Sequence, residues 1–319
     1  MMKKNILVTG GAGFIGANLV ETLLQDTRVD KVRVLDNLTT GYLANLKEFM
    51  GNPNFEFFEG DIRDYDICLK ACEGMHLISH QAALGSVPRS INDPLTTNAV
   101  NITGTLNIFT AAKENKIDRV VYAASSSTYG DHPGLPKFED RIGKPLSPYA
   151  VTKYVNELYA QVFQTTYGLN TIGLRYFNIF GPKQSPNGAY AAVIPLFVQC
   201  IIDNKRPIIN GDGTHSRDFT YVSNAVSANI LALFTQNTEG VNQIYNVACG
   251  EQTSLTQLWE SLLAFSGKSI DPIYGAERRG DVKKSLANIE KIEKNLNYKV
   301  LVNIEEGLNR LLKYTQNGK

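Results

Sequence analysis

A glycine-rich loop near the N-terminus constrains the fold of this chain more than any other feature of its sequence. The loop runs from Gly10 to Gly16 as GGAGFIG, after a β-type segment over 5–10 and at the start of a helical pattern over 16–26. Glycines at these positions let backbone N–H groups at a helix N-terminus approach a pyrophosphate. A second β-type segment ends at Asp36, whose carboxylate can accept hydrogen bonds from ribose hydroxyls. Together these features predict a dinucleotide-binding βαβ unit.

The same Asp36 favours NAD over NADP. Its charge would repel a 2′-phosphate, and no arginine follows it in the segment NLTTGY. Asp61 follows the third β-type segment and can accept a hydrogen bond from the adenine amino group, with Ile62 packing on the ring. By itself, Asp61 would more simply be a turn residue at a strand end. Its position after the glycine loop and Asp36 is what favours the cofactor interpretation.

Short β-type runs alternate with longer helical patterns through the first 180 residues, which is typical of a parallel sheet flanked by helices. The β-type runs cover residues 5–10, 32–37, 55–61, 76–83, 119–127 and 170–181, and the helical patterns cover 16–26, 66–74, 97–114 and 147–168. After Gly181 the chain changes to loops rich in Gly, Pro and Asn. We predict a doubly wound α/β (Rossmann) domain over 1–180 and a smaller α+β substrate-binding domain over 181–319. Some segments of the second part are expected to return to the first.

Charge balance and segment lengths exclude several classes of function. With 32 basic and 31 acidic residues, the chain lacks the broad positive surface expected of a nucleic-acid binder. No stretch approaches the roughly 20 apolar residues that span a bilayer, so we expect a soluble, cytoplasmic protein without a membrane partner. The four cysteines are too few and dispersed for a disulfide framework. Cys68 and Cys72 have no further ligands nearby, and we predict no metal site.

Tyr149 and Lys153 have a Tyr-x-x-x-Lys spacing, which places both side chains on one face of a helix. They lie just downstream of a β-type run that ends in Ser125, Ser126 and Ser127. A phenol has a pKa of about 10, so a tyrosine base must be stabilised as phenolate, which Lys153 and a nicotinium charge can do. A serine hydroxyl donates and accepts at once, so it can pass a proton. Without this context the spacing would indicate surface packing.

Over essentially its whole length the chain resembles the extended short-chain dehydrogenase/reductases, through TGGAGFIG, Asp36, the serine-rich strand end, YAVTK and LRYFNIFGP. It is similar in particular to the UDP-N-acetylglucosamine 4-epimerases of bacterial surface-polysaccharide clusters, through HQAALGSVPRS, AASSSTYGD, NGAYAAVIP and NGDGTHSRDF. The resemblance implies NAD as cofactor, a UDP-sugar substrate and a homodimer. It also implies Tyr149 as base and Lys153 as its partner on the nicotinamide ribose. The relay serine stays open: counting back four from Tyr129 selects Ser125, and Ser126 competes with it.

The resemblance further implies which residues line each ligand. Those expected around NAD are Gly10, Gly13, Phe14, Ile15, Gly16, Asp36, Asn37, Asp61, Ile62, Gln81, Ala82, Ala83, Asn101, Tyr149, Lys153 and Tyr176. Those expected around the UDP-sugar are Gly85, Ser86, Ser126, Ser127, Asn178, Ala192, Val193, Ile208, Asn210, Arg217, Arg278 and Ser285. Arg217 and Arg278 suit a diphosphate, because a planar guanidinium can bond two phosphate oxygens at once. Without the surrounding motifs they would be interpreted as exposed surface arginines.

The segment after Ser125 separates related reactions. Sugar-nucleotide 4,6-dehydratases typically carry an Asp-Glu pair there, and UDP-glucuronate decarboxylases a Glu, but this chain has Ser126 and Ser127. The expected activity is therefore 4-epimerisation of UDP-N-acetylglucosamine and UDP-N-acetylgalactosamine for surface polysaccharide. Ser285 supports the acetylated substrate, because related UDP-hexose epimerases place a bulky Tyr at this position beside the sugar. The alternatives are a dehydratase or decarboxylase, a dehydrogenase that releases NADH, and a catalytically silent NAD-binding scaffold.

Overall fold

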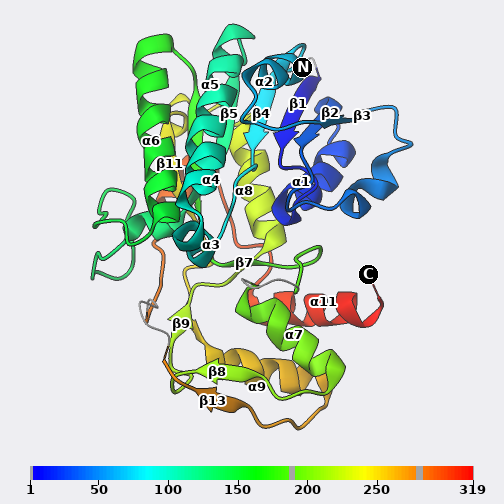
Figure 1. Cartoon of the computed structure of the whole chain (residues 1–319), viewed down its shortest axis with the longest axis vertical. Helices are drawn as coiled ribbons and strands as arrows, with labels where there is room; N and C mark the ends of the chain where they lie inside the picture. Colours follow the sequence, from blue (N-terminus) through cyan, green and yellow to red (C-terminus); the bar gives the residue numbers. More distant parts are fainter. Residues whose placement is uncertain (1–2, 187–190, 278–282, 319) are drawn as a thin grey trace.

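A seven-stranded parallel sheet forms the core of the larger lobe of the computed structural model, which describes residues 3–186, 191–277 and 283–318 (Figure 1). The strand order is β11-β6-β5-β4-β1-β2-β3, and every pairing in the sheet is parallel. The strands are β1 (Lys4–Thr9), β2 (Val29–Asp36), β3 (Phe55–Glu59), β4 (Leu77–His80), β5 (Arg119–Ser125), β6 (Thr171–Tyr176) and β11 (Gln243–Val247). The order reverses between β1 and β4, which is the topological switch point of a doubly wound sheet. The predicted α/β fold is confirmed.

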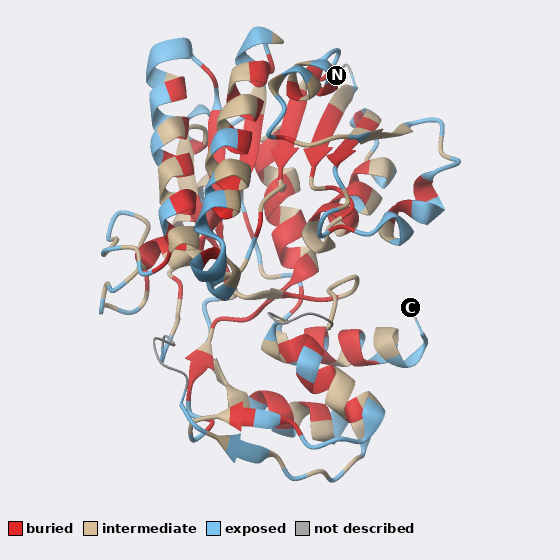
Figure 2. Ribbon diagram, in the orientation of Figure 1, coloured by how far each residue is buried: buried red, intermediate tan, exposed pale blue. Residues whose placement is uncertain are grey.

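Helices cover both faces of this sheet. One face packs on α1 (Phe14–Gln25) and α8 (Val222–Phe234), and the other on α2 (Tyr65–Cys72), α5 (Gly104–Glu114) and α6 (Pro148–Tyr167). Side chains alternate across β1, so Ile6 and Val8 join the first apolar core and Leu7 joins the second. The central strands are accordingly buried on both sides, as Figure 2 shows.

The helical pattern predicted over 97–114 is divided into three parts in the structure. It begins earlier, at Pro94, because Asp93 caps α4 (Pro94–Asn98) by accepting the Thr96 N–H at 3.0 Å. A π-helical turn, η2 (Ala99–Thr103), then leads into α5. Such turns often occur beside functional sites, and this one carries Asn101. The short helix α3 (Val87–Asn92) precedes these elements and was not predicted.

A smaller lobe lies below the carboxyl end of the sheet in Figure 1. Helix α9 (Leu255–Ser266) packs there against α7 (Val193–Asp203) and α11 (Ile304–Gln316). Short strands complete the lobe: β8 (Ile208–Asn210) pairs with β13 (Ile273–Gly275), and β9 (Ser216–Arg217) pairs with β12 (Thr253–Ser254). Phe197 and Trp259 stack edge to face in its core, with ring centroids 5.5 Å apart.

Elements beyond residue 181 divide between the two lobes. Helix α8 and strand β11 belong to the sheet lobe, and α10 (Glu290–Leu296) packs beside β11. Strand β7 (Ile179–Phe180) pairs with β10 (Thr220–Tyr221) between the lobes. The remaining short helices are η1 (Leu43–Phe49), η3 (Ser126–Tyr129) and η4 (Thr238–Gly240). None of the helices in the described ranges is long and apolar enough to cross a membrane.

Candidate active site

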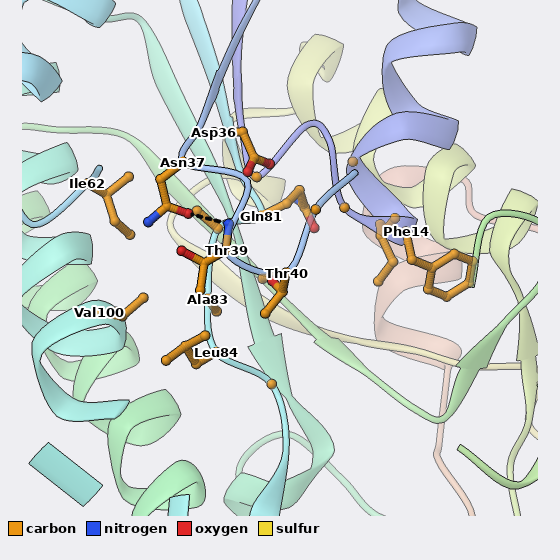
Figure 3. A pocket seen from close by; sticks show the side chains of 18 of the residues that line it. Phe14, Asp36, Asn37, Thr39, Thr40, Ile62, Gln81, Ala83, Leu84 and Val100 are labelled. Carbon is orange, nitrogen blue, oxygen red and sulfur yellow. Dashed lines mark hydrogen bonds between the residues drawn. The ribbon is translucent and has the colours of Figure 1, made fainter. Parts of the chain in front are cut away.

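A cavity of about 520 Å³ lies at the carboxyl edge of the sheet, where the glycine loop meets the ends of the neighbouring strands. All of the predicted cofactor residues except Asn101 line it: Gly10, Gly13, Phe14, Ile15, Gly16, Asp36, Asn37, Asp61, Ile62, Gln81, Ala82, Ala83, Tyr149, Lys153 and Tyr176. In Figure 3 the side chains of Ile62, Leu84 and Val100 lie on one side of this cavity, and Phe14 lies on the other.

The glycine loop has the geometry that a bound pyrophosphate requires. Gly10 has a φ of +68°, and a Cβ at this residue would lie 2.6 Å from the Ala82 nitrogen. A Cβ at Gly16 would lie 2.2 Å from the Gly10 carbonyl oxygen, so only glycine permits helix α1 to begin this close to β1. Gly13 precedes α1 without a side-chain cap, which leaves the first N–H groups of the helix available to an anion.

Asp36 ends β2 with only 8% of its surface exposed. Its two carboxylate oxygens accept the backbone N–H groups of Ala12 and Leu38 at 2.9 and 2.8 Å. Burial raises the pKa of Asp36, and these two hydrogen bonds oppose that effect. Each oxygen has a further lone pair, so the carboxylate can still accept from ribose hydroxyls. The neighbouring Asn37 is turned toward the Thr39 N–H, which it accepts at 3.1 Å (Figure 3).

The structure shows Asp61 in an ion pair that the sequence analysis missed. Arg63 donates to both of its oxygens, at 3.0 and 2.6 Å, and Asn37 Nδ2 donates to Oδ2 at 2.8 Å. The guanidinium holds the pKa of Asp61 down to about 2. Arg63 also lines the cavity, and its backbone N–H donates to Asp61 Oδ1 at 2.9 Å, so the expected adenine contact of Asp61 would share a carboxylate that already accepts four hydrogen bonds.

Asn101 lies behind the cavity wall and does not line it. Its side chain is fully buried, accepts the Leu84 N–H at 2.8 Å and donates to the Leu84 carbonyl at 3.2 Å. Asn101 Nδ2 also donates to Thr152 Oγ1 at 3.1 Å. The residue therefore fixes the backbone of Leu84, which does line the cavity, and ties it to helix α6.

Helix α6 brings the predicted catalytic pair to the inner end of the cavity. Ser147 caps the helix by accepting the Ala150 N–H at 3.1 Å, and Pro148 occupies its first position. Tyr149 therefore lies in the first turn and Lys153 in the next. Burial raises the pKa of the Tyr149 phenol, and a hydrogen bond with the Ser125 hydroxyl opposes that rise. Lys153 Nζ donates to the Ala123 carbonyl at 2.7 Å.

Burial lowers the pKa of Lys153 to about 8, and the nearby charge of Glu157 acts in the opposite direction. Ser125 lines the cavity, and its hydroxyl accepts the Ser127 hydroxyl at 2.8 Å. Ser126 and Ser127 line neither this cavity nor a second cavity that adjoins it. Of the three serines, only Ser125 thus lines the cavity together with Tyr149.

A polar network behind the cavity includes a residue that no sequence pattern indicated. Asn229 of helix α8 donates to the Tyr176 hydroxyl at 2.7 Å and accepts from Gln81 Nε2 at 3.0 Å. The Tyr176 hydroxyl in turn donates to Gln81 Oε1 at 3.0 Å. Asn229 is fully buried, and its bonds fix the orientation of Gln81 and Tyr176, both of which face the cavity.

A second cavity, of about 850 Å³, adjoins the first and shares Gly85, Asn178 and Ile179 with it. The predicted substrate residues that line it are Gly85, Ser86, Asn178, Ala192, Val193, Ile208, Asn210 and Arg217. Helix α7 begins at its wall, with Ala192 as an N-cap that has no side-chain hydrogen bond. The N-terminus of α7 and the Arg217 guanidinium give this cavity two features suited to a diphosphate.

Besides Ser126 and Ser127, two of the predicted substrate residues are not placed in this cavity. Ser285 is half-buried beside β9, where its N–H donates to the Ser216 carbonyl at 3.1 Å, and its side chain does not belong to the lining. Arg278 lies outside the described residues. His215, to which the sequence analysis assigned no role, does line the cavity and pairs with Glu277 at 3.1 Å. Within the described ranges, no three His, Cys, Asp or Glu side chains gather to hold a metal.

Comparisons with known proteins agree with this geometry. A family model described as the NAD dependent epimerase/dehydratase family matches residues 6–248. A solved UDP-N-acetylglucosamine 4-epimerase from Methanobrevibacter ruminantium M1, in complex with UDP-N-acetylmuramic acid, is 39% identical, with a TM-score of 0.94 and 100% of both chains covered.

The names of two further relatives specify other substrates. A putative UDP-glucose 4-epimerase of Methanocaldococcus jannaschii is 37% identical over 98% of both chains. A UDP-glucuronic acid 4-epimerase from Bacillus cereus, solved with UDP-glucuronic acid and NAD, is 30% identical, with a TM-score of 0.91 and 99% of this chain and 100% of that chain covered.

Proposed function

The chain belongs to the NAD dependent epimerase/dehydratase family, with NAD as its cofactor, and from this premise we propose that it is a UDP-sugar 4-epimerase that interconverts UDP-N-acetylglucosamine and UDP-N-acetylgalactosamine. One observation carries the proposal: a dinucleotide cavity that ends at Tyr149 and Ser125 adjoins a second cavity fitted for a diphosphate. The similarity to the M. ruminantium enzyme supports the acetylated substrate.

When bound, NAD would accept a hydride from C4 of the sugar and return it to the opposite face. The residues of this chain would transfer the proton of the C4 hydroxyl. Tyr149 is the base, and Ser125, which lines the same cavity and opposes the rise in the pKa of the phenol, relays the proton from the C4 hydroxyl. With its pKa lowered to about 8, Lys153 is still mostly cationic at neutral pH, and its charge favours the Tyr149 phenolate.

In this proposal Arg217, Asn178 and the N-terminus of α7 hold the diphosphate in the second cavity. Anchoring at the diphosphate leaves the sugar ring without a fixed orientation of its own. The 4-keto sugar can then turn over and present its other face to the cofactor, which inversion at C4 requires.

The acidic residues of the first cavity favour epimerisation over dehydration. Among the described residues that line it, Asp36 and Asp61 are the carboxylates. Asp36 ends β2 and Asp61 follows β3, and β1 and β4 separate these strands from β5, which ends at Ser125. A 4,6-dehydratase needs an acid and a base beside the sugar. The positions after Ser125 hold the hydroxyl residues Ser126 and Ser127 instead.

Product analysis tests the proposal. The protein is incubated with UDP-N-acetylglucosamine, UDP-glucose and UDP-glucuronate in parallel, and the nucleotide sugars are separated by chromatography, with Tyr149→Phe as control. We expect the 4-epimer of the acetylated sugar as the main product and no growth of NADH absorbance. Formation of a 4-keto-6-deoxy sugar would instead indicate a dehydratase, and no product from any UDP-sugar would indicate a silent scaffold.

We also propose that the enzyme is a homodimer formed through helix α6. Its exposed apolar side chains Val151, Leu158 and Val162 recur at helical spacing, and α3 and α4 add Ile91 and Leu95 beside it. Light scattering should give a mass of twice 35.2 kDa for the wild type and of one chain for Leu158→Glu. A monomeric wild type would refute this interface.

A further inference from the structure

Asp218 lies between two residues of the second cavity, Arg217 and Phe219, without lining the cavity itself. Its surface is 0% exposed. Its backbone carbonyl accepts Asn178 Nδ2 at 3.4 Å, so it contacts a third residue of the same cavity. A buried carboxylate in this position is costly unless its oxygens are satisfied.

Three backbone N–H groups satisfy them. Oδ1 accepts from Cys249 at 2.9 Å, and Oδ2 accepts from Gly250 at 3.0 Å and from Ala287 at 3.2 Å. Cys249 and Gly250 follow strand β11 of the large sheet, whereas Ala287 belongs to a segment that approaches from the C-terminal part of the chain. One side chain thus joins three stretches of backbone that are remote in sequence.

The third stretch, residues 283–289, is called the strap here because it runs between the lobes. At one end it bonds to β9 and at the other to the loop that follows η3. The four backbone hydrogen bonds are Ser216 N to Lys283 O (3.0 Å), Ser285 N to Ser216 O (3.1 Å), Lys137 N to Leu286 O (2.8 Å) and Asn288 N to Lys137 O (3.0 Å). The strap also contains Ser285, the residue expected beside the sugar.

We propose that Asp218 is a positioning residue for UDP-sugar binding: its carboxylate fixes Arg217 against the strap and against the end of β11. This inference rests on the proposed function, since it assumes that the second cavity binds the diphosphate. Arg217 Nη1 donates to the carbonyls of Ser216 and Lys283 at 3.0 and 3.3 Å, and the second bond ties the guanidinium to the strap.

An ionised carboxylate is the form that best satisfies all three donors. An ionised Asp218 is purely an acceptor, whereas an asparagine presents an NH₂ group in place of one oxygen. At least one of the three N–H groups would then face another donor and lose its partner. Protonation of Asp218 weakens the same bonds, because the carboxyl loses its charge and one oxygen then carries an O–H donor.

The first experiment compares Asp218→Asn with Asp212→Asn, the same substitution at an exposed carboxylate in the preceding loop. Titration calorimetry with UDP-glucose is performed at pH 8 in a Tyr149→Phe background, which suppresses turnover. We expect Asp218→Asn to weaken binding by about tenfold or more, as the loss of a charge-assisted bond implies. NAD content should be unchanged, and Asp212→Asn should stay within about twofold of the parent.

A folded Asp218→Asn variant that binds UDP-glucose within about twofold of the parent would overturn the inference. Failure of the parent itself to bind any UDP-sugar would instead refute the proposed function, and with it this role of Asp218. The two failures are therefore distinguishable.

A pH profile keeps the inference testable should Asp218→Asn not fold, and it is a property that a merely structural residue would not alter. Burial raises the pKa of Asp218 to about 6, and the nearby charge of Glu251 adds to this rise. The three N–H donors lower the pKa and so oppose the effect of burial. The other groups that interact with it are Cys249, with a pKa of about 12, and Tyr298, whose pKa lies well above its ordinary value. Neither titrates between pH 5 and 7.5.

Glu251 and the cavity residue His215 are replaced, as Glu251→Gln and His215→Asn, to remove their own titration. UDP-glucose is a diphosphodiester and lacks the phosphate ionisation near pH 6. As pH falls through about 6, Asp218 becomes protonated, and the Kd should rise with a midpoint there. A Kd that stays constant from pH 7.5 to 5 would overturn the inference.

Discussion

The ion pair between Arg175 and Glu157 gives the sharpest test of how the catalytic helix is held. Arg175 lies on β6 and Glu157 on α6, one turn beyond Lys153. Nε and Nη2 of the arginine each donate to a carboxylate oxygen at 2.8 Å, and the side chains are only 2% and 3% exposed. The guanidinium also donates to the Glu139 carbonyl at 3.0 Å.

Replacing Glu157 by Gln keeps the shape but leaves a buried guanidinium without a counter-charge. Breaking a buried pair in this way costs about 3–5 kcal/mol, because the remaining ion is neither solvated nor neutralised. For a protein of this size, such a loss corresponds to a fall in Tm of about 5–7 °C. Glu157 also raises the pKa of Lys153, so its removal should move the alkaline limb of kcat to lower pH.

The assay is thermal unfolding at fixed NAD concentration, with Glu306→Gln as matched control. Glu306 pairs with Arg310 along helix α11, but about half of each side chain is exposed, so its loss should cost at most about 0.5 kcal/mol. A Tm for Glu157→Gln equal to that of the control would refute the argument that this pair stabilises the junction of α6 and β6.

Three further predictions concern the site itself. Tyr149→Phe should keep its NAD and its Tm but lose about 10²–10⁴ in kcat, and near-normal turnover would discard Tyr149 as base. Asp36→Ala should lower the NAD content of the purified protein, and NADP should not replace NAD in the wild type; equal affinity for both would contradict the assignment. Ser285 lies outside the lining of the second cavity, and its place beside the sugar is implied by the family resemblance alone. On that implication, Ser285→Tyr should reduce kcat/KM for the acetylated UDP-sugars far more than for UDP-glucose and UDP-galactose, because an aromatic side chain would compete with the acetyl group for space. An unchanged ratio in Ser285→Tyr would leave the acetyl preference without this explanation.

The site features that depend on one short segment of the chain could be predicted from the sequence. The glycine loop, Asp36 and the Tyr149–Lys153 pair each depend on one strand end or one helix, and the structure places all of them around one cavity. Right-handed crossover connections between parallel strands restrict the possible strand orders, but the observed order is known only from the structure.

Contacts across the fold could not be predicted in the same way. Asn229 lies in an apolar helix, and nothing in its neighbourhood indicates that it bonds Tyr176 and Gln81. Asn101 was expected to face the cofactor, yet it holds Leu84 from behind. Arg63 was overlooked because its ion pair with Asp61 depends on the turn after β3 rather than on a recognisable motif.

Asn178 shows why the junction of the two cavities needs support from both lobes. Its φ of +39° is uncommon for a residue other than glycine, although asparagine tolerates this region better than most. Such a conformation costs on the order of 1–3 kcal/mol and persists only where its surroundings determine it. The Asn178 carbonyl accepts the Thr220 N–H at 3.2 Å, and its amide donates to the Asp218 carbonyl. The Asp218 carboxylate is in turn bonded to the strap and to the end of β11. The strained residue shared by both cavities is therefore held by the backbone carbonyl of the same aspartate whose carboxylate we propose positions Arg217.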